Sequence, residues 1–250
     1  MMLLPLLLAA AATPKAGPAD PAEARLHHCL ARLRSDPAAA FADADGWRQE
    51  GGGHLAQQCA GLAHAAQQQW PLAAADFEHA AQDARTARDN RVGGYWAQAG
   101  NAWLAAGEPV KARAALDAAI SAGTLTGLQL GEAQLDAARA LVATGDVAAG
   151  RAALDRALAS AGADPLAWLL SATLARRMGD LPRATHDIAE ALKRSPDDAS
   201  VQLEAGNIAA LGHDEAGARR AWAAAARLAP DSDAGRAAAV ALRQFDGEAK

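Results

Sequence analysis

The chain has 250 residues, of which 51% are apolar and only 4% aromatic, and it carries a net charge of −5. Ala and Leu supply most of the apolar fraction, which favours closely packed helices and argues against a sheet of β-branched residues. The slightly acidic balance also argues against a nucleic-acid-binding protein, because such proteins usually carry a basic face.

Residues 1–21 are typical of a signal peptide followed by a flexible lead. Leu3 to Ala12 form an apolar run that ends in three Ala, although no Lys or Arg precedes it. The run is too short to span a bilayer, and its small-residue end fits signal-peptidase cleavage. We therefore expect a periplasmic or secreted protein without a transmembrane anchor after cleavage. The alternative is a poorly ordered apolar tail.

Residues 22–53 predict a helical hairpin. Ser35-Asp36-Pro37 separates two helix-like stretches and has the form of a helix cap with Pro in the first turn. Gly51, Gly52 and Gly53 then end the second stretch.

A pattern with a period of 34 residues dominates the second half of the chain. Short turns recur at Gly145-Asp146, Gly179-Asp180 and Gly212-His213-Asp214. Small residues recur with the same interval at Ala138, Ala172 and Gly206, and larger apolar residues recur at Leu154, Ile188 and Trp222. A period in this range predicts stacked helical hairpins that bury a continuous core, which is a solenoid.

Two further units precede these with looser spacing. Gly61 and Gly100 are 39 residues apart, and Gly100 and Ala138 are 38 apart. We expect the additional residues in the connections between hairpins, since the second addition coincides with the loop-like stretch 121–127. The expected units of the 22–250 repeat domain are 54–92, 93–130, 131–164, 165–198 and 199–232, and a capping helix follows at 233–246.

This pattern resembles the tetratricopeptide repeat (TPR) family, in which a large residue opens helix A, small residues allow helices A and B to touch, and Pro ends helix B. The unit from Trp168 to Pro196 matches nearly every position of that motif. The resemblance implies an all-α, right-handed superhelical α-solenoid of about five hairpins, preceded by a divergent N-terminal hairpin and followed by a C-terminal capping helix. The whole chain also resembles small exported bacterial TPR proteins of unknown function.

The two cysteines, Cys29 and Cys59, lie on helices that would neighbour each other in a TPR stack. An even number of Cys in an exported chain favours a disulfide, and two buried free thiols are the alternative. The nearby His27, His28, His54 and His64 match no compact metal-ligand spacing. His64 occupies a core position, so a packed histidine is the simpler interpretation.

Catalytic motifs are missing from the sequence. It contains no Gly-x-Ser-x-Gly elbow, His-Glu-x-x-His helix or phosphate-binding loop. His186 and Asp187 are adjacent, but neighbours in a helix do not face each other. We therefore expect no catalytic residue, no cofactor and no metal.

In TPR proteins the A helices line the concave face, so their non-core positions are the candidate contacts. By the repeat register these are Gln98, Asn101, Asp136, Arg139, Leu169, Leu170, Thr173, Arg176, Arg177, Glu204 and Asn207. The Lys residues of the family's carboxylate clamp are missing, since Ala97 and Leu203 stand at the matching positions. Arg139 and Arg176 together would offer a different anion contact.

The resulting hypothesis is a periplasmic scaffold without catalytic activity, which binds a protein or peptide on its concave face. The alternative is an envelope enzyme, or a redox or metal protein, that uses the N-terminal Cys and His residues.

Overall fold

The computed structural model describes residues 20–248 and folds them into thirteen helices without any strand. The signal peptide that we expect near the N-terminus lies almost entirely outside these residues. The helices are α1 (Pro21–Leu33), α2 (Pro37–Gln49), α3 (Gly53–Ala66), α4 (Trp70–Ala87), α5 (Val92–Ala105), α6 (Pro109–Ser121), α7 (Gly127–Ala143), α8 (Val147–Ala161), α9 (Pro165–Arg177), α10 (Leu181–Arg194), α11 (Ala199–Leu211), α12 (Glu215–Leu228) and α13 (Asp233–Glu248). Within residues 20–248, no helix combines the length and apolarity that crossing a membrane requires.

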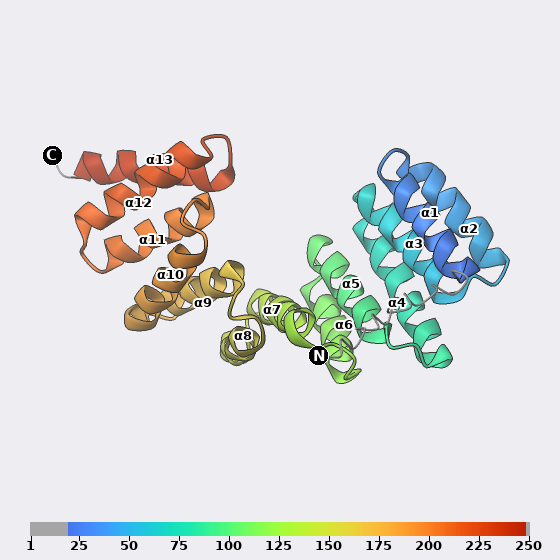
Figure 1. Cartoon of the computed structure of the whole chain (residues 1–250). Helices are drawn as coiled ribbons and strands as arrows, with labels where there is room; N and C mark the ends of the chain where they lie inside the picture. The colour runs from blue at the N-terminus through green and yellow to red at the C-terminus, as the bar shows by residue number, and fades with distance from the viewer. Residues whose placement is uncertain (1–19, 249–250) are drawn as a thin grey trace, which may run out of the picture.

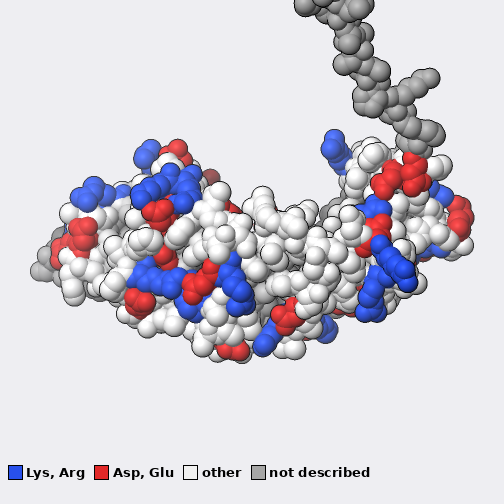
Figure 2. Space-filling view, turned by 60° about the horizontal axis from the view of Figure 1, so that its bottom comes forward, with Lys and Arg blue, Asp and Glu red and all other residues white. Residues whose placement is uncertain are grey.

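Consecutive helices pair into antiparallel hairpins, and each hairpin packs against the next along the chain. Figure 1 shows α1 to α4 at one end, α7 and α8 in the middle, and α11 to α13 at the other end. This serial arrangement confirms the predicted all-α solenoid. In Figure 2 one edge of the molecule is hollowed between the two ends, where charged side chains gather, and the surface between them is largely uncharged.

The turn inside each hairpin follows from a two-residue signal. Gly145 and Gly179 adopt φ of 87° and 77°, left-handed values at which glycine avoids the strain that a Cβ brings. The Asp that follows each of them caps the next helix by accepting a backbone N–H. In the third unit the left-handed residue is His213, with φ of 60°, and Asp214 is the cap. The residue equivalent to the turn glycines is therefore His213, and not Gly212.

The core of every hairpin is a contact between a small residue of helix A and a large residue of helix B, 16 positions later in the chain. These pairs are Gly61 with Phe77, Gly100 with Leu116, Ala138 with Leu154, Ala172 with Ile188, and Gly206 with Trp222. An added Cβ at Gly61 would lie 2.6 Å from the Phe77 ring, which is closer than real contacts allow. Small residues at the crossing therefore let the two helices approach, and the large side chain fills the space between them.

The N-terminal hairpin is fastened to the stack by a disulfide between Cys29 of α1 and Cys59 of α3, as expected. The two Cα atoms are 6.2 Å apart, and both side chains are buried beside Trp47. On the chain-entropy description, closing a loop of this length contributes about 3–4 kcal/mol to the free energy of unfolding. In addition, Arg91 donates to Glu23 at 2.7 Å, which ties α1 to the start of α5.

The additional residues of the first two spacings do not all lie in connections. The stretch 122–126 is a loop between α6 and α7, as predicted. However, α4 has 18 residues and α7 has 17, so both helices exceed the 13 to 15 residues of their neighbours in the stack. The expectation that connections absorb the additions is therefore wrong in part, because a helix lengthens by adding backbone hydrogen bonds whereas a loop adds none.

The last hairpin is covered by α13, which packs against both α11 and α12. Phe245 meets the Trp222 ring edge to face, with centroids 5.4 Å apart, and Ala238 is fully buried against the same cluster. The terminal helix thus shields the apolar edge that the array would otherwise expose, as the capping role predicts.

The crossing contact makes a specific prediction for Gly206. A Cβ at this position would lie within 2.8 Å of Trp222 Cγ, so we expect Gly206→Ala to lower the free energy of unfolding by about 1–3 kcal/mol. Gly94→Ala is the matched control, because nothing lies within 4 Å of that position and the helix gains about 0.5–1 kcal/mol. Denaturant unfolding measures both. In a Trp222→Leu background the cost of Gly206→Ala should shrink, and an unchanged cost would show that the ring is not the cause.

Candidate binding groove

A cavity of 310 Å³ opens on the surface formed by the first helices of the hairpins, α3, α5, α7, α9 and α11, which we call the helix-A face. Its lining residues are Ala138, Arg139, Val142 and Ala143 of α7, Leu154 of α8, and Leu170, Thr173, Leu174 and Arg177 of α9. We call it the α7–α9 groove. Four of the residues predicted from the repeat register, Arg139, Leu170, Thr173 and Arg177, meet here.

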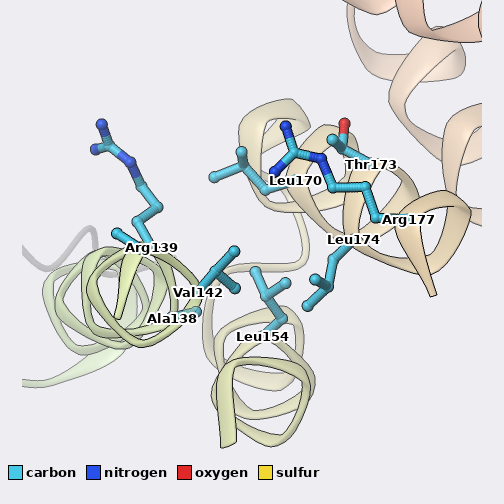
Figure 3. Close-up of a pocket in the computed structure, with 9 residues that line it drawn as sticks. Ala138, Arg139, Val142, Leu154, Leu170, Thr173, Leu174 and Arg177 are labelled. Atoms are coloured by element: carbon cyan, nitrogen blue, oxygen red, sulfur yellow. The ribbon is translucent and has the colours of Figure 1, made fainter. Parts of the chain in front are cut away.

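The groove exists because neighbouring A helices are not evenly spaced. α5 packs against α7, and α9 packs against α11, but α7 and α9 make little direct backbone contact. α8 lies below the gap and contributes Leu154 to its floor (Figure 3). The widest opening between A helices that lines a described cavity is therefore between the third and fourth repeats.

The floor and the rims of the groove differ in chemistry. Figure 3 shows Val142, Leu154 and Leu174 at the bottom, Arg139 on the α7 rim and Arg177 on the α9 rim. Both guanidinium-bearing residues are exposed, whereas Leu154 and Leu174 are buried. The arrangement offers an apolar floor between two cationic edges, which suits a side chain that is apolar at its tip beside a negatively charged group.

Asp136 lies beside the groove and engages the α7 rim. Its carboxylate accepts a hydrogen bond from Arg139 at 2.8 Å and another from Asn101 of α5. Burial raises the pKa of Asp136, and the hydrogen bond from Arg139 opposes this shift without cancelling it. Asp136 and Asn101 therefore join α5 to α7, and they are not free contact residues as predicted.

Arg176, Glu204 and Asn207 form a second internal network, between α9 and α11. Arg176 Nε donates to Glu204 Oε1 at 2.6 Å, and the Glu204 carboxylate is only 6% exposed. Asn207 donates to Glu204 and accepts from Trp222 Nε1 at 3.1 Å. The prediction that Arg176 joins Arg139 in an anion contact is therefore wrong, because the adjacent repeat supplies its carboxylate partner.

The remaining predicted residues lie away from the groove. Leu169 packs against the core cluster of α9, α10 and α11. Gln98 of α5 has a buried Oε1 without a hydrogen-bond partner among residues 20–248. Neither lines the α7–α9 groove.

The N-terminal Cys and His residues are spread over the first hairpins. Both thiols are consumed by the disulfide, and His27 and His28 are exposed on α1. His64 is buried, with Nδ1 2.7 Å from Asp76 Oδ2, which confirms the interpretation as a packed histidine. Over the described part of the chain, no three His, Cys, Asp or Glu side chains are placed to share a metal ion.

One polar cluster escaped the sequence analysis. Contrary to expectation, His186 Nδ1 lies 2.9 Å from Asp187 Oδ1, and Ser171 Oγ donates to the other oxygen of the same carboxylate. Ser171 is fully buried, and its proton is directed at Asp187 and not at the imidazole. The cluster joins α9 to α10 and lacks the serine-to-histidine hydrogen bond that nucleophilic activation requires.

Comparisons with known proteins identify the fold. No family model matches the sequence, and no curated protein matches it either. PilF of Pseudomonas aeruginosa matches 91% of this chain over 97% of its own, with a TM-score of 0.71 and 15% identity. PilW, described as a type IV pilus biogenesis factor, matches 86% over 96% of its own, with a TM-score of 0.70 and 17% identity.

A third solved structure names the repeat. YrrB, described as a TPR protein with an unusual peptide-binding site, matches 82% of this chain over 98% of its own, with a TM-score of 0.58 and 18% identity. The fold is that of a TPR solenoid. At these identities the likeness concerns the TPR fold alone.

The network between α9 and α11 can be tested with adjacent arginines. Arg176→Ala would leave the buried Glu204 carboxylate without its partner, so we expect the free energy of unfolding to fall by about 2–4 kcal/mol. Arg177→Ala removes an exposed side chain from the same helix and should change it by less than about 0.5 kcal/mol. Denaturant unfolding compares the two, and equal losses would contradict a structural role for Arg176.

Proposed function

We propose that this chain is an exported TPR scaffold without catalytic activity, which binds a segment of a partner protein in the α7–α9 groove. The observation that carries the proposal is the convergence of Arg139, Leu170, Thr173 and Arg177 over an apolar floor. These residues come from two repeats, so the groove depends on the stacked array and not on one hairpin. YrrB, a TPR protein described by its peptide-binding site, supports a peptide as the class of ligand.

The form of the groove favours a side-chain anchor from an extended or helical segment. Its apolar floor removes an aliphatic group from water, and Thr173 and the two arginines provide hydrogen-bond donors at the edge. TPR-type helical arrays present such donors on preformed elements, so little ordering is required on binding. A short segment of another protein therefore fits the groove better than a large flat interface does.

Export is the second part of the proposal. It is supported by the apolar run from Leu3 to Ala12 and by the Cys29–Cys59 bond, since disulfides persist mainly in oxidising compartments. Intact mass spectrometry of the full chain, expressed in a bacterial host and purified from the periplasm without reductant, tests both points. We expect a mature chain that begins near Ala12 and lacks the two thiol hydrogens. An uncleaved, reduced chain confined to the cytoplasm would contradict export.

Site-specific photo-crosslinking tests the binding site. We expect p-benzoyl-phenylalanine at Thr173 to capture a discrete partner segment in cells of the source organism, because this side chain lies on the wall of the groove. The same probe at Ala159, an exposed position of α8 that lines none of the described cavities, is the matched control.

Mass spectrometry of the crosslinked peptides identifies the contact. Capture at Thr173 that disappears when Leu174→Trp fills the floor supports the proposal. Equal capture at both positions, or capture that Leu174→Trp does not reduce, would place the binding surface elsewhere.

A further inference from the structure

One position of helix A carries an acid in some repeats and an apolar residue in another. Asp136 of α7, Leu170 of α9 and Glu204 of α11 are spaced by 34 residues and occupy equivalent positions. Asp136 accepts a hydrogen bond from Asn101 of the preceding A helix, and Glu204 accepts two from Arg176 of the preceding A helix. The acid at this position therefore joins its helix to the preceding A helix. In α9 that acid is missing.

The donors that face Leu170 are consequently not satisfied across the gap. Arg139 occupies the same repeat position on α7 as Asn101 does on α5, but its pairing is with Asp136 in its own helix. This pair spans one helical turn, and the Arg139 side chain remains 48% exposed. Arg177 on the opposite rim makes no ion pair or hydrogen bond within residues 20–248. Two cations thus border a place where the neighbouring repeat interfaces hold a carboxylate.

We propose that an acidic segment of the partner protein supplies this missing carboxylate. An Asp or Glu of the segment lies between Arg139 and Arg177, and an adjacent aliphatic side chain lies on the floor of Val142, Leu154 and Leu174. This inference rests on the proposed function and names the chemistry of its ligand. It commits to a segment of another protein as the occupant.

Charge complementarity and the floor together set the preference. Guanidinium groups pair with carboxylates through two parallel hydrogen bonds, and such bonds are stronger beside an apolar surface than in open water. A basic segment would meet two cations with no acid in reach except Asp136, which Asn101 and Arg139 already occupy. The groove should therefore discriminate between acidic and basic segments through repulsion as well as attraction.

A positional-scanning peptide library tests the proposal. The probes are synthetic peptides with a fixed Leu, randomised neighbours, and one position at a time held as Asp, Glu, Asn, Gln or Lys. We expect the full-length protein to retain Asp and Glu peptides about tenfold or more over their Asn and Gln counterparts, and Lys peptides least. The preference should weaken as salt rises, because the rim arginines are exposed.

Leu170→Glu restores the acid that the other repeats carry, and it is the decisive variant. We expect Glu at position 170 to pair with the rim arginines and to lower retention of acidic peptides at least about tenfold. Leu166→Glu places the same charge on the same helix outside the groove lining, at a position that is 45% exposed, and should keep the acidic preference. Arg139→Glu combined with Arg177→Glu should reverse the preference toward Lys peptides. Thermal unfolding establishes that each variant is folded.

The outcomes separate the inference from the function on which it rests. Retention of peptides without an acidic preference, or equal effects of Leu170→Glu and Leu166→Glu, would overturn the inference and leave the proposed function standing. Retention of no library peptide at all would contradict both. Dimerisation that Leu170→Glu abolishes in sedimentation experiments would identify a second copy of this chain as the occupant and overturn the assignment to a partner protein.

Discussion

The structure depends on one steric constraint, the close crossing of helices A and B at a small residue. Where the facing residue is Phe77 or Trp222 the small residue is glycine, and where it is Leu154 or Ile188 alanine suffices. The sum of the two volumes is thereby kept nearly constant along the array, so successive hairpins can stack with similar geometry. Because each hairpin buries its core mainly against its neighbours, the two ends need separate solutions. α1 is fastened by a disulfide, and α13 covers the last hairpin.

Polar contacts between A helices are added to this apolar frame, and they vary from repeat to repeat. Asn101 with Asp136 joins α5 to α7, and Arg176 with Glu204 joins α9 to α11. Between α7 and α9 no such pair forms in the described structure, because Leu170 stands where the neighbouring helices have an acid. The interface that lacks its internal carboxylate is the one that opens into a groove. A single change in the repeat pattern thus produces both the cavity and its unpaired cations.

The successes and errors of the sequence analysis have a common explanation. Periodicity assigns each residue to a face of its helix, so Arg139, Thr173 and Arg177 are correctly placed on the helix-A face. Periodicity does not report the distance between consecutive A helices. Arg176 and Glu204 lie on that same face, yet they are consumed by each other because α9 and α11 touch. The contact of His186 with Asp187 was missed for a related reason, since rotatable side chains can meet even where their Cα–Cβ bonds diverge.

The amino-acid sequence by itself determined the helices, their pairing into hairpins and the crossing residues, because a 34-residue period and the Gly-Asp turns act through contacts that are local along the chain. It also indicated the disulfide, since Cys29 and Cys59 lie on neighbouring helices. Only the tertiary structure decided which interfaces between A helices close and which one opens. That outcome depends on the packing of side chains from three helices at once, and on whether a carboxylate from the next repeat reaches the cation that faces it.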